Sequence, residues 1–270
     1  WGNNANGQLG NNTTTPSLIP VQVSGITGGT WSVAAGNSFS CALTNGAIKC
    51  WGNNADGQLG NNSTVQSLVP VQVQGFATRG QIIAAGQQRA CAIGAGMTQC
   101  WGNNSNGQLG SGNTAPSLVP TLALGMTGGP VHIAGGWRFA CAVVDKGDVQ
   151  CWGRNGSGSL GTGDNSDRWM PTQVSGIPDG AQAITLGDQY SCAIVNGGVW
   201  CWGAGWNGRL GDGTGNSNNY PVQVQGVGGI GVLSDVTGLA GSDNTMCALS
   251  NGNVYCWGYG ADGRMGINNA

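Results

Sequence analysis

The chain has 270 residues, of which 53 are Gly, only 7% are charged and none is Glu, and its net charge is −2. Asn, Asp, Gly, Ser and Thr favour turns over helix, so the composition argues against helix almost everywhere. An apolar fraction of 39% with 11 Trp can still form a core, while nine Lys and Arg give no basic surface for nucleic acid or an anionic membrane. We therefore expect a folded all-β protein with no nucleic-acid partner and no membrane insertion.

Trp-Gly pairs recur along the chain at nearly constant spacing. They begin at residues 1, 51, 101, 152, 202 and 257, so the steps are 50, 50, 51, 50 and 55 residues. Self-similarity at such a period indicates a repeat protein. We expect one repeat domain over residues 1–270, with repeats 1–50, 51–100, 101–151, 152–201 and 202–256 and a partial sixth at 257–270.

Each repeat carries the same signals in the same order. A Gly-Gln-Leu-Gly-like turn comes first (residues 7–10), then a Pro that opens a short alternating run (20–23), then a small apolar run ending in Gly (32–36), then a hairpin between two Cys (41–50). These signals predict four short strands per period. A four-stranded sheet of this size must stack on its neighbours, and the pattern favours a propeller blade over a solenoid coil.

The cysteines fall at fixed places in the last hairpin. Asn45-Gly46 predicts a two-residue turn, which places Cys41 opposite Cys50 in a non-hydrogen-bonded pair. The Cα atoms of such a pair are about 4.5 Å apart, within the reach of a disulfide. In the third repeat the Cys are one residue farther apart, but the three-residue loop 145–147 preserves the register. Ala95-Gly96 is the one turn of unconvincing chemistry.

Zinc is the rival explanation for paired Cys, but it needs four ligands, and each repeat offers two Cys with no nearby His. We therefore predict five disulfides, each contributing about 2–3 kcal/mol in the loop-entropy treatment. Disulfides persist in oxidising compartments, so we expect a secreted or surface-displayed protein. The pairs are Cys41–Cys50, Cys91–Cys100, Cys141–Cys151, Cys192–Cys201 and Cys247–Cys256.

The stretch from Trp51 to Gly60, Trp-Gly-Asn-Asn-Ala-Asp-Gly-Gln-Leu-Gly, resembles the repeat of the regulator of chromosome condensation family, and the resemblance covers essentially the whole chain. It implies β-propeller blades, typically seven in a closed ring. Two features depart from the family. Where family members often have His, this chain has Phe39, Arg89, Phe139 and Tyr190, and the paired Cys are absent from intracellular members. The nucleotide-exchange activity of the namesake is not carried over.

No pattern of residues predicts catalysis. His132 is the only histidine, and we interpret it as an exposed or rim residue without a partner. The Asp pairs 164/167 and 145/148 lie in predicted loops and read as turn formers, and the Asn- and Asp-rich loops lack the Glu of a calcium loop. We expect no enzyme, no cofactor and no metal site.

The eleven Trp fall into two groups. The six of the Trp-Gly pairs (1, 51, 101, 152, 202 and 257) are predicted to pack between blades. The other five lie outside the repeat pattern and are candidates for a contact surface. They are Trp31, Trp137, Trp169, Trp200 and Trp206.

Two functions of different class remain open. The first is a structural, self-assembling extracellular protein, a unit of a fibre, sheath or surface layer. The second is a secreted propeller binding module that presents loops to a protein or glycan partner. Near-identical repeats favour the first; unusual loops on one face, and the looser fifth repeat with its Gly-rich stretch 226–241, favour the second.

The two ends of the chain carry the same segment of the repeat. Trp1 to Gly10 and Trp257 to Gly266 match, and no initiator Met or signal-like segment precedes Trp1, which indicates a processed product or an excised piece. Five repeats and part of a sixth do not make the family's seven-bladed ring. We therefore expect an open array whose ends meet other copies of the repeat, the alternative being a self-contained propeller with fewer blades.

Overall fold

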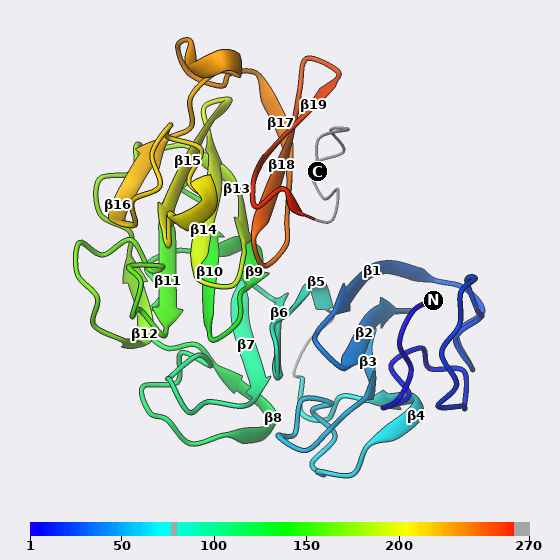
Figure 1. Cartoon of the computed structure of the whole chain (residues 1–270). Coiled ribbons are helices and arrows are strands. Elements are labelled where there is room, and N and C mark those ends of the chain that lie inside the picture. The colour runs from blue at the N-terminus through cyan, green and yellow to red at the C-terminus, as the bar shows by residue number, and fades with distance from the viewer. Residues whose placement is uncertain (77–79, 262–270) are drawn as a thin grey trace.

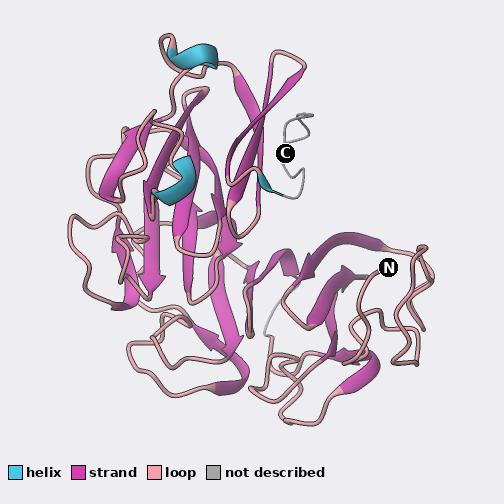
Figure 2. Cartoon of the chain, viewed as in Figure 1, coloured by secondary structure: helices cyan, strands magenta, loops and turns pink. Residues whose placement is uncertain are grey.

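The computed structural model describes residues 1–76 and 80–261, and this part of the chain is almost entirely β-structure (Figures 1 and 2). Its strands form five antiparallel sheets, each a propeller blade. None of its helices is long or apolar enough to cross a membrane. Two short 3-10 turns, η1 (Trp206–Gly208) and η2 (Val227–Gly229), lie wholly inside it.

The first four blades have four strands each, and the fifth has three in the described part of the chain. Strands run in sequence order from the inner to the outer edge of each blade. The blades are β1 (Thr30–Ala35), β2 (Phe39–Thr44), β3 (Ala47–Gly52) and β4 (Ser67–Gln72); β5 (Gly80–Ala85), β6 (Arg89–Gly94), β7 (Met97–Gly102) and β8 (Ser117–Leu122); β9 (Pro130–Gly135), β10 (Phe139–Val144), β11 (Val149–Gly153) and β12 (Arg168–Gln173); β13 (Ala181–Leu186), β14 (Tyr190–Val195), β15 (Gly198–Gly203) and β16 (Asn218–Gln223); and β17 (Val236–Gly241), β18 (Thr245–Ser250) and β19 (Asn253–Gly258).

The outer strand of each blade comes from the next sequence repeat. In the first blade, β4 pairs with β3 through Gly52–Ser67 and Cys50–Val71. The expectation that this strand opens at its Pro was wrong, because β4 begins three residues earlier and holds Pro70 in its interior. Pro is tolerated there because an outer strand has one edge without a strand partner.

The cysteine hairpins have the register expected from their turns. Cys41 lies opposite Cys50, and Cys141 lies opposite Cys151 across the longer loop. All ten Cys are joined in five disulfides, one per blade. Ala95 adopts a left-handed φ of 49°, much like Asn45 in the equivalent turn.

Each repeated Trp links its own blade to the preceding repeat. The indole of Trp101 is fully buried and donates to the backbone oxygen of Gln58 at 3.0 Å. Gly60, which ends the same turn, lies against this ring; a Cβ there would be 2.7 Å from the indole nitrogen. The same bond recurs from Trp51, Trp152, Trp202 and Trp257. The Gly-Gln-Leu-Gly turn and the Trp-Gly pair are therefore two halves of one inter-blade joint.

A buried Asn organises four of the five long loops that follow the Trp-Gly pairs in the described part of the chain. Asn54 accepts from the backbone N–H of Leu59 at 2.9 Å and donates to the backbone oxygens of Ser63 and Val65. Asn4, Asn104 and Asn155 make equivalent bonds. The asparagine side chain therefore holds together residues of the loop that are up to 11 positions apart. The fifth loop has Gly205 at this place, and η1 follows it.

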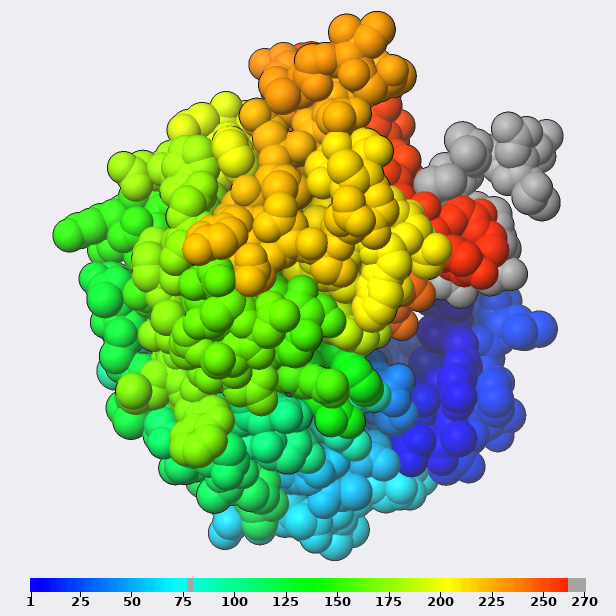
Figure 3. Space-filling view, turned by 60° about the vertical axis from the view of Figure 1, so that its left-hand side comes forward, coloured from blue at the N-terminus to red at the C-terminus, as the bar shows by residue number. Residues whose placement is uncertain are grey.

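The five blades form an open arc rather than a closed ring. Neighbouring inner strands pack against one another in the order β1, β5, β9, β13 and β17. Figure 1 shows blade 5 and the N-terminal blade on either side of the opening. The extra residues of the fifth repeat include η2, which stands out from the surface in Figure 3 (orange).

Candidate binding face

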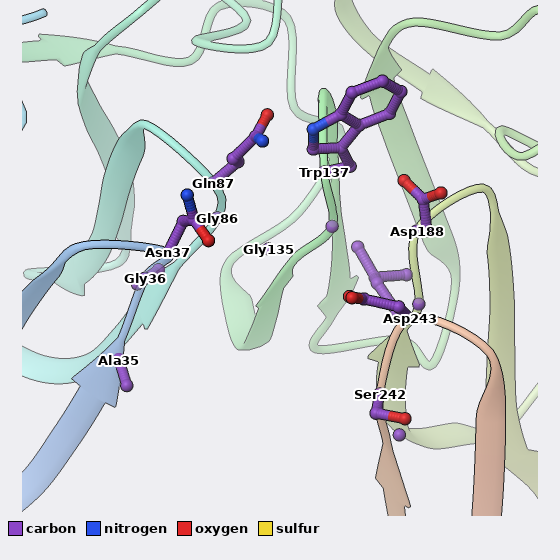
Figure 4. Close-up of a pocket in the computed structure, with 15 residues that line it drawn as sticks. Ala35, Gly36, Asn37, Gly86, Gln87, Gly135, Trp137, Asp188, Ser242 and Asp243 are labelled. Carbon is purple, nitrogen blue, oxygen red and sulfur yellow. The ribbon is translucent and has the colours of Figure 1, made fainter. Parts of the chain in front are cut away.

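One end of the arc has a central mouth surrounded by five short loops. Each loop joins the inner strand of a blade to its second strand, and together they line a cavity of about 440 Å³ (Figure 4). Neighbouring loops are joined by backbone bonds from Asn37 to Gln87 at 3.4 Å and from Asp188 to Asp243 at 3.3 Å. The fold therefore holds the five loops, and the side chains that they carry, close together. We call this end of the molecule the mouth face.

The residue that each loop offers to the mouth differs from blade to blade. The equivalent positions are Asn37, Gln87, Trp137, Asp188 and Asp243. In Figure 4 the indole nitrogen edge of Trp137 and the carboxylate of Asp243 both point toward the cavity. Blades 1 and 2 thus contribute neutral amides, whereas blades 3 to 5 contribute an indole and two carboxylates. The mouth can hydrogen-bond a polar ligand from several sides at once.

Arginines gather on the same face beside aromatic rings. The guanidinium carbon of Arg138 lies 4.4 Å from the ring centroid of Trp137, and that of Arg154 lies 5.7 Å from it. Between blades 4 and 5, Arg209 lies over Trp206 at 5.1 Å and near Tyr190 at 6.0 Å. Burial raises the pKa of Tyr190 above its ordinary value. Such contacts are worth roughly 0.5–2 kcal/mol each and hold the cations in place.

Arg89 is completely buried behind the mouth. It donates to the backbone oxygens of Gly136 and Phe139, but its Nε has no hydrogen-bond partner. No acidic side chain forms an ion pair with it in the described part of the chain. Burial lowers the pKa of the Arg89 guanidinium to about 9.

We interpreted His132 from the sequence as an exposed or rim residue, but it is not exposed. It lies half-buried in β9, opposite Val143, and its Nδ1 is buried without a partner among the described residues. Burial lowers the pKa of its imidazole.

Asp164 accepts from the Ser166 backbone N–H and pairs with Arg168, and these contacts lower the pKa of its carboxyl. Asp167 accepts from the Asn155 backbone, so both carboxylates order a loop.

The prediction for the Trp of the Trp-Gly pairs holds from Trp51 to Trp202, which are buried, whereas Trp257 is half-buried and Trp1 is 75% exposed. The buried ones bond to the turn of the preceding repeat, and the given sequence holds no such turn before Trp1. Of the five other Trp, only Trp137 and Trp206 lie on the mouth face. Trp31 begins an inner strand, Trp169 lies in an outer strand, and Trp200 packs against the core, so they do not form one surface.

Sequence reasoning missed most residues of the mouth face. The missed side chains are Arg89, Arg138, Arg154, Asp188, Arg209 and Asp243. A signal for them was present, because each departs from its equivalents in the first repeats of the chain or, for Arg89, Arg138 and Arg154, in all other repeats. In the sequence these residues are spread over more than 150 positions, and only the arc of blades brings them to one face.

These blades and their disulfide hairpins define a β-propeller repeat protein with one polar, non-repeating face. The profile of the RCC1-like domain family matches residues 1–270, and the chain belongs to this family. No curated protein matches the chain in sequence.

Solved structures show the same fold at low identity. Human WBSCR16 is 24% identical with a TM-score of 0.80, over 92% of this chain and 66% of that one. Yeast RCC1 (Prp20), solved bound to Kap60, is 21% identical with a TM-score of 0.84, over 100% and 67%. The ectodomain of the Arabidopsis thaliana receptor kinase ACR4 is 20% identical with a TM-score of 0.50, over 88% and 67%. The chain thus spans about two thirds of the length of these proteins.

Proposed function

We propose that the chain is an extracellular, non-catalytic binding module that recognises a protein partner through its mouth face. One observation carries this proposal. The blades repeat closely in their strands, disulfides and inter-blade Trp, whereas aromatic and charged residues replace the neutral ones in the mouth loops of blades 3 to 5. Holding the repeated blades together does not require such differences, but a specific contact surface does.

Two further observations support this proposal. Five disulfides indicate an oxidising environment, so a partner outside the cell is expected. Proteins of the same fold bind proteins: yeast RCC1 (Prp20) was solved with Kap60, and Prp20p is described as binding Gsp1p and histones. The receptor kinase ectodomain offers an extracellular example of the fold. The identity of the partner does not transfer at these levels of identity.

The test compares three forms of the chain against a displayed library of extracellular proteins. In the mouth variant, Trp137→Gln, Asp188→Gln and Asp243→Gln install the residue that blade 2 carries. In the control variant, Lys146→Gln alters a hairpin on the opposite face. We expect ligands selected on the natural chain to lose binding to the mouth variant and to keep binding to the control. Ligands that bind the mouth variant unchanged would contradict the proposal.

A second candidate function is self-assembly, as the close similarity of the repeats suggested. Residues 17–22 have the sequence Ser-Leu-Ile-Pro-Val-Gln, almost that of β4, yet among the described residues they form only a bridge between Ser17 and Gly2. Leu18 is 99% exposed there. In the described part of the chain, β19 has no outer strand beside it. A strand of this sequence from another copy would complete blade 5 as β4 completes blade 1.

Self-assembly is tested by sedimentation of the unreduced chain over a wide concentration range. Association that Leu18→Lys with Ile19→Lys abolishes would support this second function. A monomer at all concentrations would exclude it and would leave the binding module unaffected.

A further inference from the structure

Blade 3 carries an arrangement found in no other blade of the described chain. In every blade, the first residue after the third strand donates its backbone N–H to a carbonyl of the mouth loop. The acceptor is the residue that directly follows the mouth position of that blade, such as Ser38 after Asn37. In blade 3 the pair is Arg154 to Arg138, at 3.0 Å. The other pairs are Asn53 to Ser38, Asn103 to Gln88, Ala204 to Gln189 and Tyr259 to Asn244. The fold thus forces two arginines together where other blades have uncharged residues.

The two guanidinium groups are held in place but make no ion pair. Both lie within 6 Å of the ring centroid of Trp137. The only ion pair in the described part of the chain joins Arg168 to Asp164, farther along the loop that Arg154 starts. Neither Arg138 nor Arg154 donates a side-chain hydrogen bond there. A guanidinium stacked on an indole keeps its N–H edge free for a planar anion, so the pair is pre-organised for a carboxylate.

Carboxylates lie on the adjoining blades of the same mouth. Asp188 lines a small groove between blades 3 and 4 together with Arg138 and Arg154. Its position is fixed by a chain of bonds: the Ser157 hydroxyl donates to Gln189 at 2.7 Å, and the Gln189 amide donates to Asp188 at 3.3 Å. Asp243 is joined to Asp188 through their backbones. Blade 3 therefore contributes two cations to the mouth face and blades 4 and 5 contribute two carboxylates, while the arginine between blades 4 and 5, Arg209, is buried.

This separation of charge selects among anionic ligands. A polyanion such as a sulfated glycan would place further negative groups beside Asp188 and Asp243, and like charges in contact are unfavourable. The net charge of −2 would also oppose its approach. An acidic side chain flanked by a basic one matches both sides of the mouth. A folded or extended polypeptide supplies such neighbours, which makes a protein the favoured source of the anion.

We infer that Arg138 and Arg154, stacked on Trp137, form a clamp for an Asp or Glu side chain of the partner, and that Asp188 and Asp243 receive a basic side chain next to it. This inference rests on the proposed function and names the chemistry of its partner. Trp137, Asp188 and Asp243 line the cavity of about 440 Å³, which is large enough to receive a side chain. The two arginines lie beside it, in the small groove that they line together with Trp137 and Asp188.

The test uses synthetic Gly-Ser peptides that carry one Glu and one Lys at varied spacing, with binding followed by fluorescence anisotropy. The clamp variant, Arg138→Gln with Arg154→Asn, installs the residues of blade 2, so its fold has an internal precedent. Arg168→Gln, which removes a cation from the ion pair outside the mouth, is the matched control. We expect the clamp variant, but not the control, to weaken the best peptide at least about tenfold.

A matched change in the peptide tests whether the clamp meets the carboxylate. Replacing its Glu by Gln is expected to weaken binding to the natural chain about tenfold, and to have little effect on the clamp variant. Equal losses against both proteins would overturn the inference. So would a heparin oligosaccharide that binds more tightly than every peptide, or the absence of binding by all peptides. Each of these results leaves the library selection able to succeed, so failure of the clamp and failure of the binding module are distinguishable.

Discussion

Arg89 shows how a single residue departs from the repeat at a cost. Its equivalents Phe39 and Phe139 are buried hydrocarbons, whereas Arg89 is a fully buried cation with no carboxylate beside it. Two backbone oxygens satisfy part of the guanidinium, but its Nε remains without a partner. A buried charge of this kind loses hydration that hydrogen bonds only partly replace. The protein carries this residue at the expense of stability.

Replacing Arg89 by Phe should therefore stabilise the protein. We expect the free energy of unfolding to rise by about 1–4 kcal/mol, measured by urea denaturation without reductant. Arg168→Met, which removes a partly exposed arginine and its ion pair, should change it by less than about 1 kcal/mol. A destabilised Arg89→Phe variant would show that the bonds to Gly136 and Phe139 outweigh the buried charge.

The gain from Arg89→Phe should depend on pH. The pKa of Arg89 is lowered in the folded protein to about 9, so folding disfavours its charged form. The penalty is complete below this pKa and declines as the pH rises from it toward the higher pKa of the unfolded chain. The difference in unfolding free energy between variant and natural chain should thus be smaller at about pH 10.5 than at about pH 7. An unchanged difference would contradict the lowered pKa.

At this scale the sequence predicts whatever depends on local period. The register of Cys41 with Cys50 follows from the two-residue turn and the alternation of a strand. The burial of Arg89 and the pairing of Arg138 with Arg154 depend on contacts between loops and blades, and no local pattern contains them. Alignment of the five repeats against one another would have marked these positions as departures.

At the scale of the element, the inter-blade joint explains the repeat motif. Gly60 is left-handed with a φ of 65° and lies against the indole of Trp101. Two independent constraints therefore require Gly at this position. Gly75 has a similar φ of 72°, but no atom of the described residues lies within 4 Å of the place where a Cβ would stand.

Comparing Ala at these two glycines separates the constraints. Gly75→Ala should lower the free energy of unfolding by about 1 kcal/mol, from backbone strain alone. Gly60→Ala should lower it by roughly 2–5 kcal/mol, because the added methyl also displaces Trp101. Thermal unfolding with intact disulfides measures both. Equal losses would mean that the indole moves aside freely and that the joint is not rigid.

The turn of the second hairpin offers a further test. Ala95 has a φ of 49°, a conformation that Asn tolerates better than Ala. Ala95→Asn should raise the free energy of unfolding by about 0.5–1 kcal/mol, and the reverse change Asn45→Ala should lower it by a similar amount. Chemical denaturation of the two variants measures this. A stability loss in Ala95→Asn would argue against the left-handed turn.

The strands could be predicted from the sequence, but the blade to which each strand belongs could not. Composition and turn signals predict the strands, the hairpins and four strands per period. That β4 belongs to the blade before its own repeat was not predicted, because sequence landmarks mark the start of a repeat and not the sheet that a strand joins.

At the scale of the whole molecule, the residues that hold the blades together differ from those that could bind a partner. Disulfides, buried Asn and Trp joints are shared by the blades, while the mouth loops of blades 3 to 5 differ. The sequence could predict the repeat and the propeller, but not which departures would meet, because that depends on the curvature of the arc. We therefore expect a protein partner to bind at the mouth face.

The most direct measurement is hydrogen exchange of the unreduced chain, alone and with the tightest ligand selected from the library. The account predicts slower exchange in the loops at 136–138, 187–189 and 242–244, and unchanged exchange in the cysteine hairpin turns on the opposite face. Slower exchange confined to those hairpin turns or to the outer strands β4, β8 and β12 would contradict it.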